Sequence, residues 1–186
     1  MGTTLITLAV VAALGAFVVG LYNQLVRLRN ASEGAWSDID VQLKRRYELI
    51  PNLVETVKGF AAHEKSTLEE VTRARTSAMG ARSVEERAGA EGTLTRALAG
   101  LFAVAEAYPQ LRANENFLSL QAELSALEDA IQNARRYYNA VVRDLNTKCE
   151  AFPSNIVAGI FGFSRRDYFE LDAVAERTAP RVEFGS

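Results

Sequence analysis

The longest hydrophobic pattern in the chain covers residues 114–150, where apolar positions recur in steps of three and four. Such a repeat keeps one face of an α-helix turned toward a partner over several heptads. We therefore expect one long helix here, about 55 Å in length at 1.5 Å per residue. Its predicted bundle-core positions are Phe117, Leu120, Leu124, Leu127, Ile131, Tyr138 and Leu145.

A second stripe with the same steps begins at Trp36 and continues to Val71, with Pro51 inside it. The stripe keeps its phase across the proline and Ile50 is a poor cap, so a kinked continuous helix over residues 22–78 is favoured over two helices. Arg46 and Glu64 interrupt the stripe, and they either lie at its edge or pair with charged neighbours in the bundle. The predicted core positions on this helix are Trp36, Ile39, Leu43, Leu53, Val57 and Phe60.

The middle of the chain predicts a shorter third helix. Residues 80–83 form a tight connection in which Ser83 caps the helix, and the pattern ends before Pro109. Asn114 is well placed to cap the long helix beyond. The first helix would be roughly 85 Å long and the middle one about 35 Å, and this mismatch leaves apolar surface for the folded-back tail or another subunit to cover. A second subunit is favoured, because the tail is largely used up in a short apolar segment and an extended end. We therefore predict a homo-oligomer.

The chain begins with an almost unbroken apolar run over residues 5–22, and no charged residue precedes Arg27. This length is near the lower limit for spanning a bilayer. A retained membrane anchor is favoured over a cleaved signal peptide, because the positive n-region of such peptides is missing. A face of small residues on this segment could let two such helices approach closely, and it consists of Ala12, Ala16 and Gly20.

Orientation follows from the basic residues that flank the predicted anchor. Arg27 and Arg29 follow the span and nothing basic precedes it, so the positive-inside rule places the N-terminus outside and the bundle in the cytoplasm.

The segment after Pro153 is apolar on nearly all sides, and Ser154 or Asn155 could cap it. One interpretation is a lid packed on the open end of the bundle. The other is an exposed contact for a membrane or partner, with Arg165 and Arg166 at its rim. The residues of that contact are Ile156, Ile160, Phe161 and Phe163, and residues 180–184 after it are expected to be extended.

Composition narrows the classes of function. The 186-residue chain has 21 basic and 23 acidic residues and a net charge of −2, and their interleaving argues against nucleic-acid binding. Cys149 has no activating histidine in a readable motif, and His63, interpreted as a solvated helix residue, has no second metal ligand at the required spacing. We therefore expect no catalytic residues, no metal or cofactor site and no small-molecule substrate.

Three stretches carry more specific motifs. They are residues 36–60 (WSDIDVQLKRRYELIPNLVETVKGF), residues 108–121 (YPQLRANENFLSLQ), and residues 134–163, with ARRYYNAVVRDLN followed by FPSNIVAGIFGF. Together they closely resemble the LemA family, and the likeness covers residues 22–184. The resemblance implies an integral membrane protein with a short N-terminal anchor and an α-helical bundle, in a family with no established enzymatic activity. Its relatives include a magnetosome-associated member, and family members are often discussed beside membrane-bound zinc peptidases.

The sequence thus predicts an all-α fold, in which an N-terminal transmembrane helix continues into an elongated antiparallel bundle of long, coiled-coil-like helices. The expected parts are an anchor (residues 1–26), a helical bundle (27–150) and an apolar lid with an extended tail (151–186). The expected function is a non-enzymatic, self-associating scaffold in the bacterial inner membrane, with the lipid bilayer and a second copy as partners. The alternative is an adaptor or signalling subunit that binds another membrane protein, such as a membrane peptidase.

Overall fold

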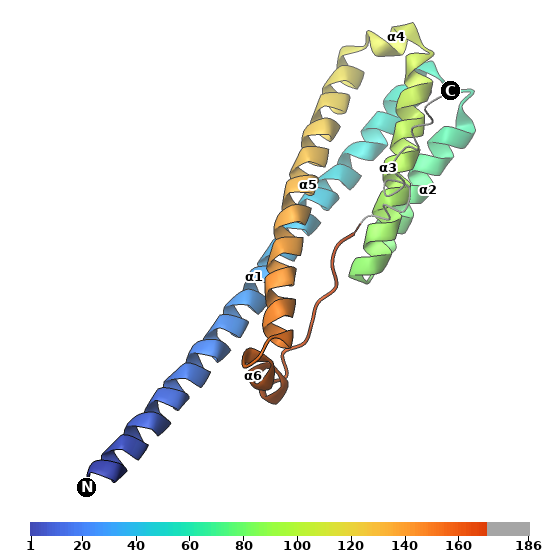
Figure 1. Cartoon of the computed structure of the whole chain (residues 1–186). Coiled ribbons are helices and arrows are strands. Elements are labelled where there is room, and N and C mark those ends of the chain that lie inside the picture. Colours follow the sequence, from blue (N-terminus) through green and yellow to red (C-terminus); the bar gives the residue numbers. More distant parts are fainter. Residues whose placement is uncertain (171–186) are drawn as a thin grey trace, which may run out of the picture. The chain divides into compact units, whose positions relative to one another are not determined.

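The computed structural model describes residues 1–170, and these residues form six α-helices with no strand among them (Figure 1). The prediction of an all-α fold, with a long apolar N-terminal helix and a helical bundle, is confirmed. The predicted extended end at residues 180–184 lies outside the described residues.

Helix α1 spans Gly2–Phe60 and contains Pro51, so the prediction that the proline does not end the helix is confirmed. Because proline has no N–H, the carbonyl of Tyr47 one turn earlier loses its helical donor. The side chain of Arg75 replaces that donor, since its Nε donates to the Tyr47 carbonyl at 2.7 Å. A side chain from the following helix therefore satisfies the backbone group that the proline leaves open.

The predicted continuation of the first helix to residue 78 is wrong. Helix α1 ends at Phe60, residues 61–64 turn the chain, and α2 covers Lys65–Gly80. Gly59 weakens the last turn of α1, and His63 is exposed within the turn instead of on a helix. The first helix of the bundle is thus shorter than expected, and the argument for oligomers from unequal helix lengths loses its premise.

The two helix caps predicted at Ser83 and Asn114 are confirmed. Helix α3, Val84–Glu106, begins with a capping box in which Ser83 accepts from the Glu86 N–H and the Glu86 side chain accepts from the Ser83 N–H. A single-turn helix α4, Pro109–Arg112, lies in the predicted turn. Helix α5, Glu115–Glu150, is capped by Asn114, whose Oδ1 accepts from the N–H of Phe117 at 3.0 Å.

Helix α6, Ser154–Phe161, starts differently from the prediction. Its N-cap position is Pro153, which offers no side-chain cap, and the Ser154 hydroxyl instead donates to the carbonyl of Ala151 at 2.9 Å. The helix ends at Gly162, whose φ of 71° lies in the left-handed region that glycine adopts without strain. The N–H of Phe163 then donates to the Ala158 carbonyl at 2.9 Å, which turns the chain back.

The helices divide between two compact units. The first contains Met1–Val41 and Ile131–Tyr168, and the second contains Gln42–Ala130 with the described residues 169 and 170. In the second unit α2 packs against α3. Buried apolar residues of that unit come from all its long helices, and they include Ile50, Val71, Leu94, Leu98, Leu101 and Leu111. The three-part division expected from the sequence stays a prediction.

The residues predicted as bundle core occupy three kinds of position. Trp36 and Leu120 are half-buried. The prediction that Phe60 is a core residue is wrong. Phe60 is the last residue of α1 and is 40% exposed, whereas the next residue, Ala61, is buried. The others are buried, namely Ile39, Leu43, Leu53, Val57, Phe117, Leu124, Leu127, Ile131, Tyr138 and Leu145.

Candidate membrane-facing site

The apolar start of α1 is exposed along its whole length. Every residue from 1 to 20 is exposed, and α1 is long and apolar enough to cross a membrane. A core helix of a soluble protein would be buried over this window, whereas none of it is buried here. Ala12, Ala16 and Gly20 all lie on this exposed part, and a Cβ added at Gly20 would meet nothing within 4 Å.

Directly beyond this segment, the inner face of α6 packs on the same helix. Val157 and Ala158 are buried with Leu25 of α1 and Leu145 of α5, and they form one hydrophobic cluster in the first unit. Leu21, Leu28 and Phe163 pack against its border. Figure 1 shows α6 beside α1 at the end of α5. This arrangement fixes α6 next to the end of the apolar run.

Much of the apolar surface of α6 is uncovered by the described residues. Ile160 is 73% exposed, Ile156 and Phe161 are each 53% exposed, and Phe163 is half-buried. One face of α6 thus packs on α1 and α5, as the lid interpretation expects, while Ile156 and Ile160 on the other side stay exposed. The contact with a membrane or partner stays a prediction.

Aromatic rings connect α6 to the end of the anchor. The ring of Tyr22 lies 4.8 Å from that of Phe161 and 5.7 Å from that of Phe163, centroid to centroid. The guanidinium of Arg29 lies 5.3 Å from the centroid of the Phe163 ring, within cation–π range. Tyrosine and arginine are the side chains that commonly flank the apolar part of a membrane span.

The segment after α6 is held against α5 and α1 by polar contacts. Asn146 uses both ends of its amide, accepting from the Arg166 N–H and donating to the Arg166 carbonyl at 2.9 Å each. The Arg166 guanidinium pairs with Glu33 at 2.6 Å, and Arg165 pairs with Glu150 at 2.9 Å. The two arginines predicted at the rim of α6 thus form ion pairs that hold the returning chain in place.

Tyr138 belongs to the same part of the first unit. Its hydroxyl donates to the carbonyl of Asp167 at 3.0 Å, and its ring lies 5.4 Å from that of Trp36. Burial raises the pKa of the Tyr138 phenol, and burial likewise raises the pKa of the Cys149 thiol. In both groups burial favours the neutral form over the charged one.

The second unit contains a buried charged network around Arg46, which is only 2% exposed. Its Nη1 donates to Glu91 at 2.9 Å, and its Nη2 lies 2.5 Å from Glu128 and donates to the hydroxyl of Thr95 at 3.0 Å. Its Nε has no hydrogen-bond partner among the residues that the structure describes. Of the two alternatives for Arg46, the structure shows pairing in the bundle.

Glu91 is the acceptor at the centre of this network. The hydroxyl of Tyr47 donates to its second oxygen. Burial raises the pKa of Glu91 above its ordinary value, although the Tyr47 hydrogen bond and the charge of Arg46 act in the opposite direction. Burial and the same hydrogen bond raise the pKa of Tyr47. Glu64, the other charged residue in the stripe, accepts from the hydroxyl of Tyr108 at 3.2 Å.

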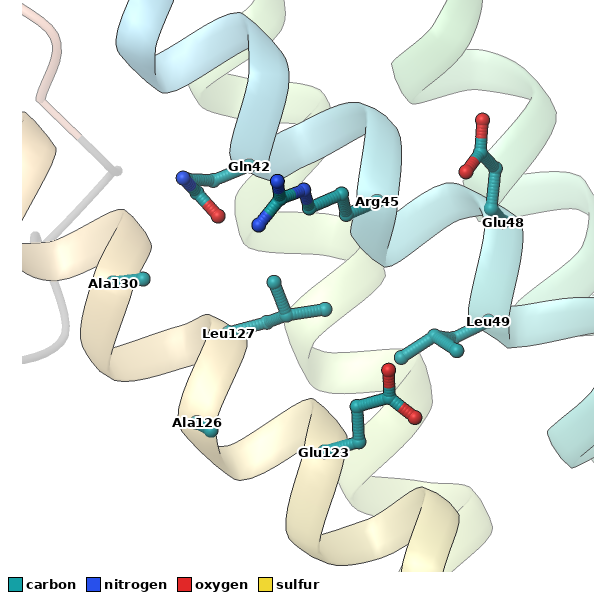
Figure 2. Close-up of a pocket in the computed structure, with 8 residues that line it drawn as sticks. All are labelled: Gln42, Arg45, Glu48, Leu49, Glu123, Ala126, Leu127 and Ala130. Atoms are coloured by element: carbon teal, nitrogen blue, oxygen red, sulfur yellow. The ribbon is translucent and has the colours of Figure 1, made fainter.

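A groove lies between α1 and α5 in the second unit (Figure 2). Leu49 and Leu127 point into it from the two helices, and Arg45, Glu48 and Glu123 surround them. The groove thus has a small apolar floor with charges of both signs. Within residues 1–170, no three His, Cys, Asp or Glu side chains gather in a way that could hold a metal ion.

Some of the residues that form these sites were not identified from the sequence. Leu25 and Ser32 are fully buried in the first unit, and continuing the Trp36 stripe backward in steps of three and four would have reached both. Glu91 could not have been found, because it lies on another helix and no local pattern pairs it with Arg46.

Comparisons with known proteins identify the family of this chain and several of its relatives. A family model described as the LemA family matches residues 35–184. Magnetosome protein MamQ 2 of Paramagnetospirillum magneticum is 28% identical over 88% of this chain and 69% of its own length. MamQ of Magnetospirillum gryphiswaldense is 26% identical over 86% and 69% of the two chains. Protein LemA of Metamycoplasma hominis is 30% identical over 75% of this chain and 64% of its own length.

Proposed function

The chain belongs to the LemA family. We propose that it is a non-enzymatic scaffold, which self-associates through its anchor and organises the membrane or membrane proteins. It is a membrane-associated protein, as the exposed apolar start of α1 and the family membership indicate. The relatives named as magnetosome proteins support a part in organising a cellular structure.

The observation that carries the proposal is the free face of small residues on α1. An α-helix turns by about 100° per residue, so Ala16 and Leu25, nine residues apart, point in directions about 180° apart. Leu25 faces α5 and α6 in the hydrophobic cluster. The face formed by Ala12, Ala16 and Gly20 is therefore on the opposite side of α1, where a second copy can approach closely without meeting α6.

We further propose that the protein lies in a bacterial inner membrane with its N-terminus outside. Arg27 and Arg29 follow the span within two turns, and cytoplasmic flanks carry such an excess of basic residues. The helical units beyond the span would then lie in the cytoplasm.

The alternative function is an adaptor or signalling subunit that binds another membrane protein, such as a membrane peptidase. The groove between α1 and α5 favours it, because exposed charges of both signs around an apolar floor suit a partner helix with complementary charges. A self-associating scaffold does not need this groove.

Particle mass tests the scaffold proposal. We would solubilise the full-length protein in detergent and compare the wild type with Gly20→Leu and Gly15→Leu. Both glycines have open space at the Cβ position, but Gly15 lies about 100° around the helix from Ala16, whereas Gly20 lies about 40° away. We expect oligomers for the wild type and for Gly15→Leu and a shift to monomers for Gly20→Leu.

A wild type that is monomeric at concentrations above those in the membrane would remove the scaffold proposal and leave the adaptor. Cross-linked partners recovered from native membranes with Arg45→Glu as the comparison would then test the adaptor, since that change reverses one charge beside the groove.

A further inference from the structure

We propose that α6 is an interfacial membrane helix, whose outer face inserts into the boundary between headgroups and acyl chains of the bilayer that α1 spans. The occupant of this exposed face is therefore lipid. The inference needs the protein's association with the membrane but not its self-association, so it goes beyond the proposed function.

The packing of α6 places it directly at the end of the span. Its buried face, Val157 and Ala158, contacts Leu25, which lies three residues beyond the apolar run at residues 5–22. At 1.5 Å per residue, this is a displacement of only about 5 Å along α1. Helix α6 is thus held where the hydrocarbon core gives way to the headgroups.

The aromatic contacts place the tip of α6 still closer to lipid. Phe161 lies against Tyr22, the last residue of the apolar run, with 4.8 Å between ring centroids. A bilayer that covers the run must reach the level of Tyr22, and tyrosine is a typical residue of that level. Phe161 therefore lies at the edge of the hydrocarbon whenever the span is inserted.

The composition of the exposed face matches an interfacial helix. Ile156 and Ile160 point away from Val157 and Ala158, and Phe161 lies at the end of the helix beside Tyr22. All three are large, apolar and more than half exposed, and α6 itself carries no charged residue. Such side chains are unfavourable in water and favourable in the interface. Their continuity with the exposed span selects lipid over a protein partner, because the same bilayer is already present beside them.

Two arginine side chains lie close to α6. Arg29 packs on Phe163, and Arg165, just after α6, pairs with Glu150 while 66% of its side chain stays exposed. Arginines at this height can reach lipid phosphates while their aliphatic stems cover apolar surface. The arrangement of apolar tip and basic rim is that of helices that lie in the membrane plane.

Fluorescence quenching of a single label tests this inference. We would replace Cys149 by serine, introduce Ile160→Cys, attach an environment-sensitive NBD label and reconstitute the full-length protein into phosphatidylcholine vesicles. The matched control is Met79→Cys on α2, an apolar position that is likewise exposed, at 52%. Vesicles with and without spin-labelled lipid, and iodide in the buffer, report whether the label is in lipid or in water.

We expect the label at position 160 to emit at shorter wavelength, to lose most of its emission with spin-labelled lipid and to resist iodide. The label at position 79 should show the reverse. Because Ile160 is 73% exposed, labelling should leave helical content unchanged, and circular dichroism checks this.

Iodide quenching at position 160 equal to that at position 79 would place the face in water and overturn the proposal. Protection of the label from both quenchers would show that protein covers this face and would also overturn the proposal. If that protection were lost when the protein is diluted in lipid, the covering protein would be a second copy. The same labelling in Gly20→Leu, the variant expected to be monomeric, distinguishes this inference from the scaffold proposal. Lipid quenching that persists in that variant would show that α6 meets lipid without self-association.

Discussion

The buried network around Arg46 makes a quantitative prediction for Glu91→Leu. Arg46 and Glu91 are each 2% exposed and joined at 2.9 Å. Removing one member of a buried pair leaves the other charge uncompensated and costs about 3–5 kcal/mol. Glu128, which is 35% exposed and 2.5 Å from the guanidinium, retains part of the compensation, so we expect about 3 kcal/mol. For a chain of this size, this corresponds to a fall in Tm of about 6–12 °C.

The assay is thermal unfolding of the full-length protein in detergent, followed by circular dichroism at the helical band. Glu123→Ala is the matched control, because it also removes a glutamate but from an exposed position, and it should change stability by less than about 0.5 kcal/mol. Glu91→Gln should fall between the two, since the amide keeps an acceptor for Tyr47 without the charge.

The double variant Arg46→Met with Glu91→Leu provides the decisive comparison. With both charges gone, the buried desolvation cost disappears and Glu128 can be solvated, so the double variant should be more stable than Glu91→Leu alone. A Glu91→Leu melt within the range of the control, or a double variant that is less stable than either single variant, would refute the assignment of Arg46 and Glu91 as a coupled pair.

Three further predictions concern the anchor, the pH dependence and the absence of catalysis. The protein should stay in the membrane fraction after alkaline carbonate washing, and a mature N-terminus beyond residue 16 would contradict this. Burial raises the folded-state pKa of Glu91 above its ordinary value of 4.5. The stability that Glu91 contributes is therefore present below pH 4.5 and is lost as the pH rises through the raised pKa. Over this pH window, the free energy of unfolding of the wild type should fall relative to that of Glu91→Gln. Cys149→Ser and His63→Ala should leave the cellular phenotype intact, and loss of function in a folded variant would indicate chemistry at that residue.

Much of the fold could be predicted because helix burial follows a fixed period. Steps of three and four on α5 identify the side that packs, and Ser83 and Asn114 satisfy free N–H groups by local chemistry that the sequence displays. The end of α1 could not be predicted in this way. Only Gly59 weakens the helix there, and the turn at residues 61–64 is short enough that the stripe resumes in phase on α2.

The candidate sites were harder to predict from the sequence, because contacts between distant residues determine them. The apolar character of α6 was evident, but a helix that is apolar nearly all round has no period from which its packed face can be chosen. Val157 and Ala158 face inward only because Leu25 and Leu145 meet them. Likewise, the partner of Arg46 lies 45 residues away on α3, and local pattern gives no information at that separation.

The uninterrupted course of α1 links the protein to the thickness of its bilayer. The apolar run is about 27 Å long at 1.5 Å per residue, slightly less than the hydrocarbon core of a typical bilayer, about 30 Å. No turn separates this run from the part of α1 that carries α6, since the helix continues through residue 41 of the first unit. Any tilt of the span is therefore a tilt of that unit, and a thicker bilayer must thin locally around the span or be met by flanking side chains that reach toward the headgroups, each at an energetic cost. A membrane of uneven thickness should consequently concentrate this protein in its thinner regions.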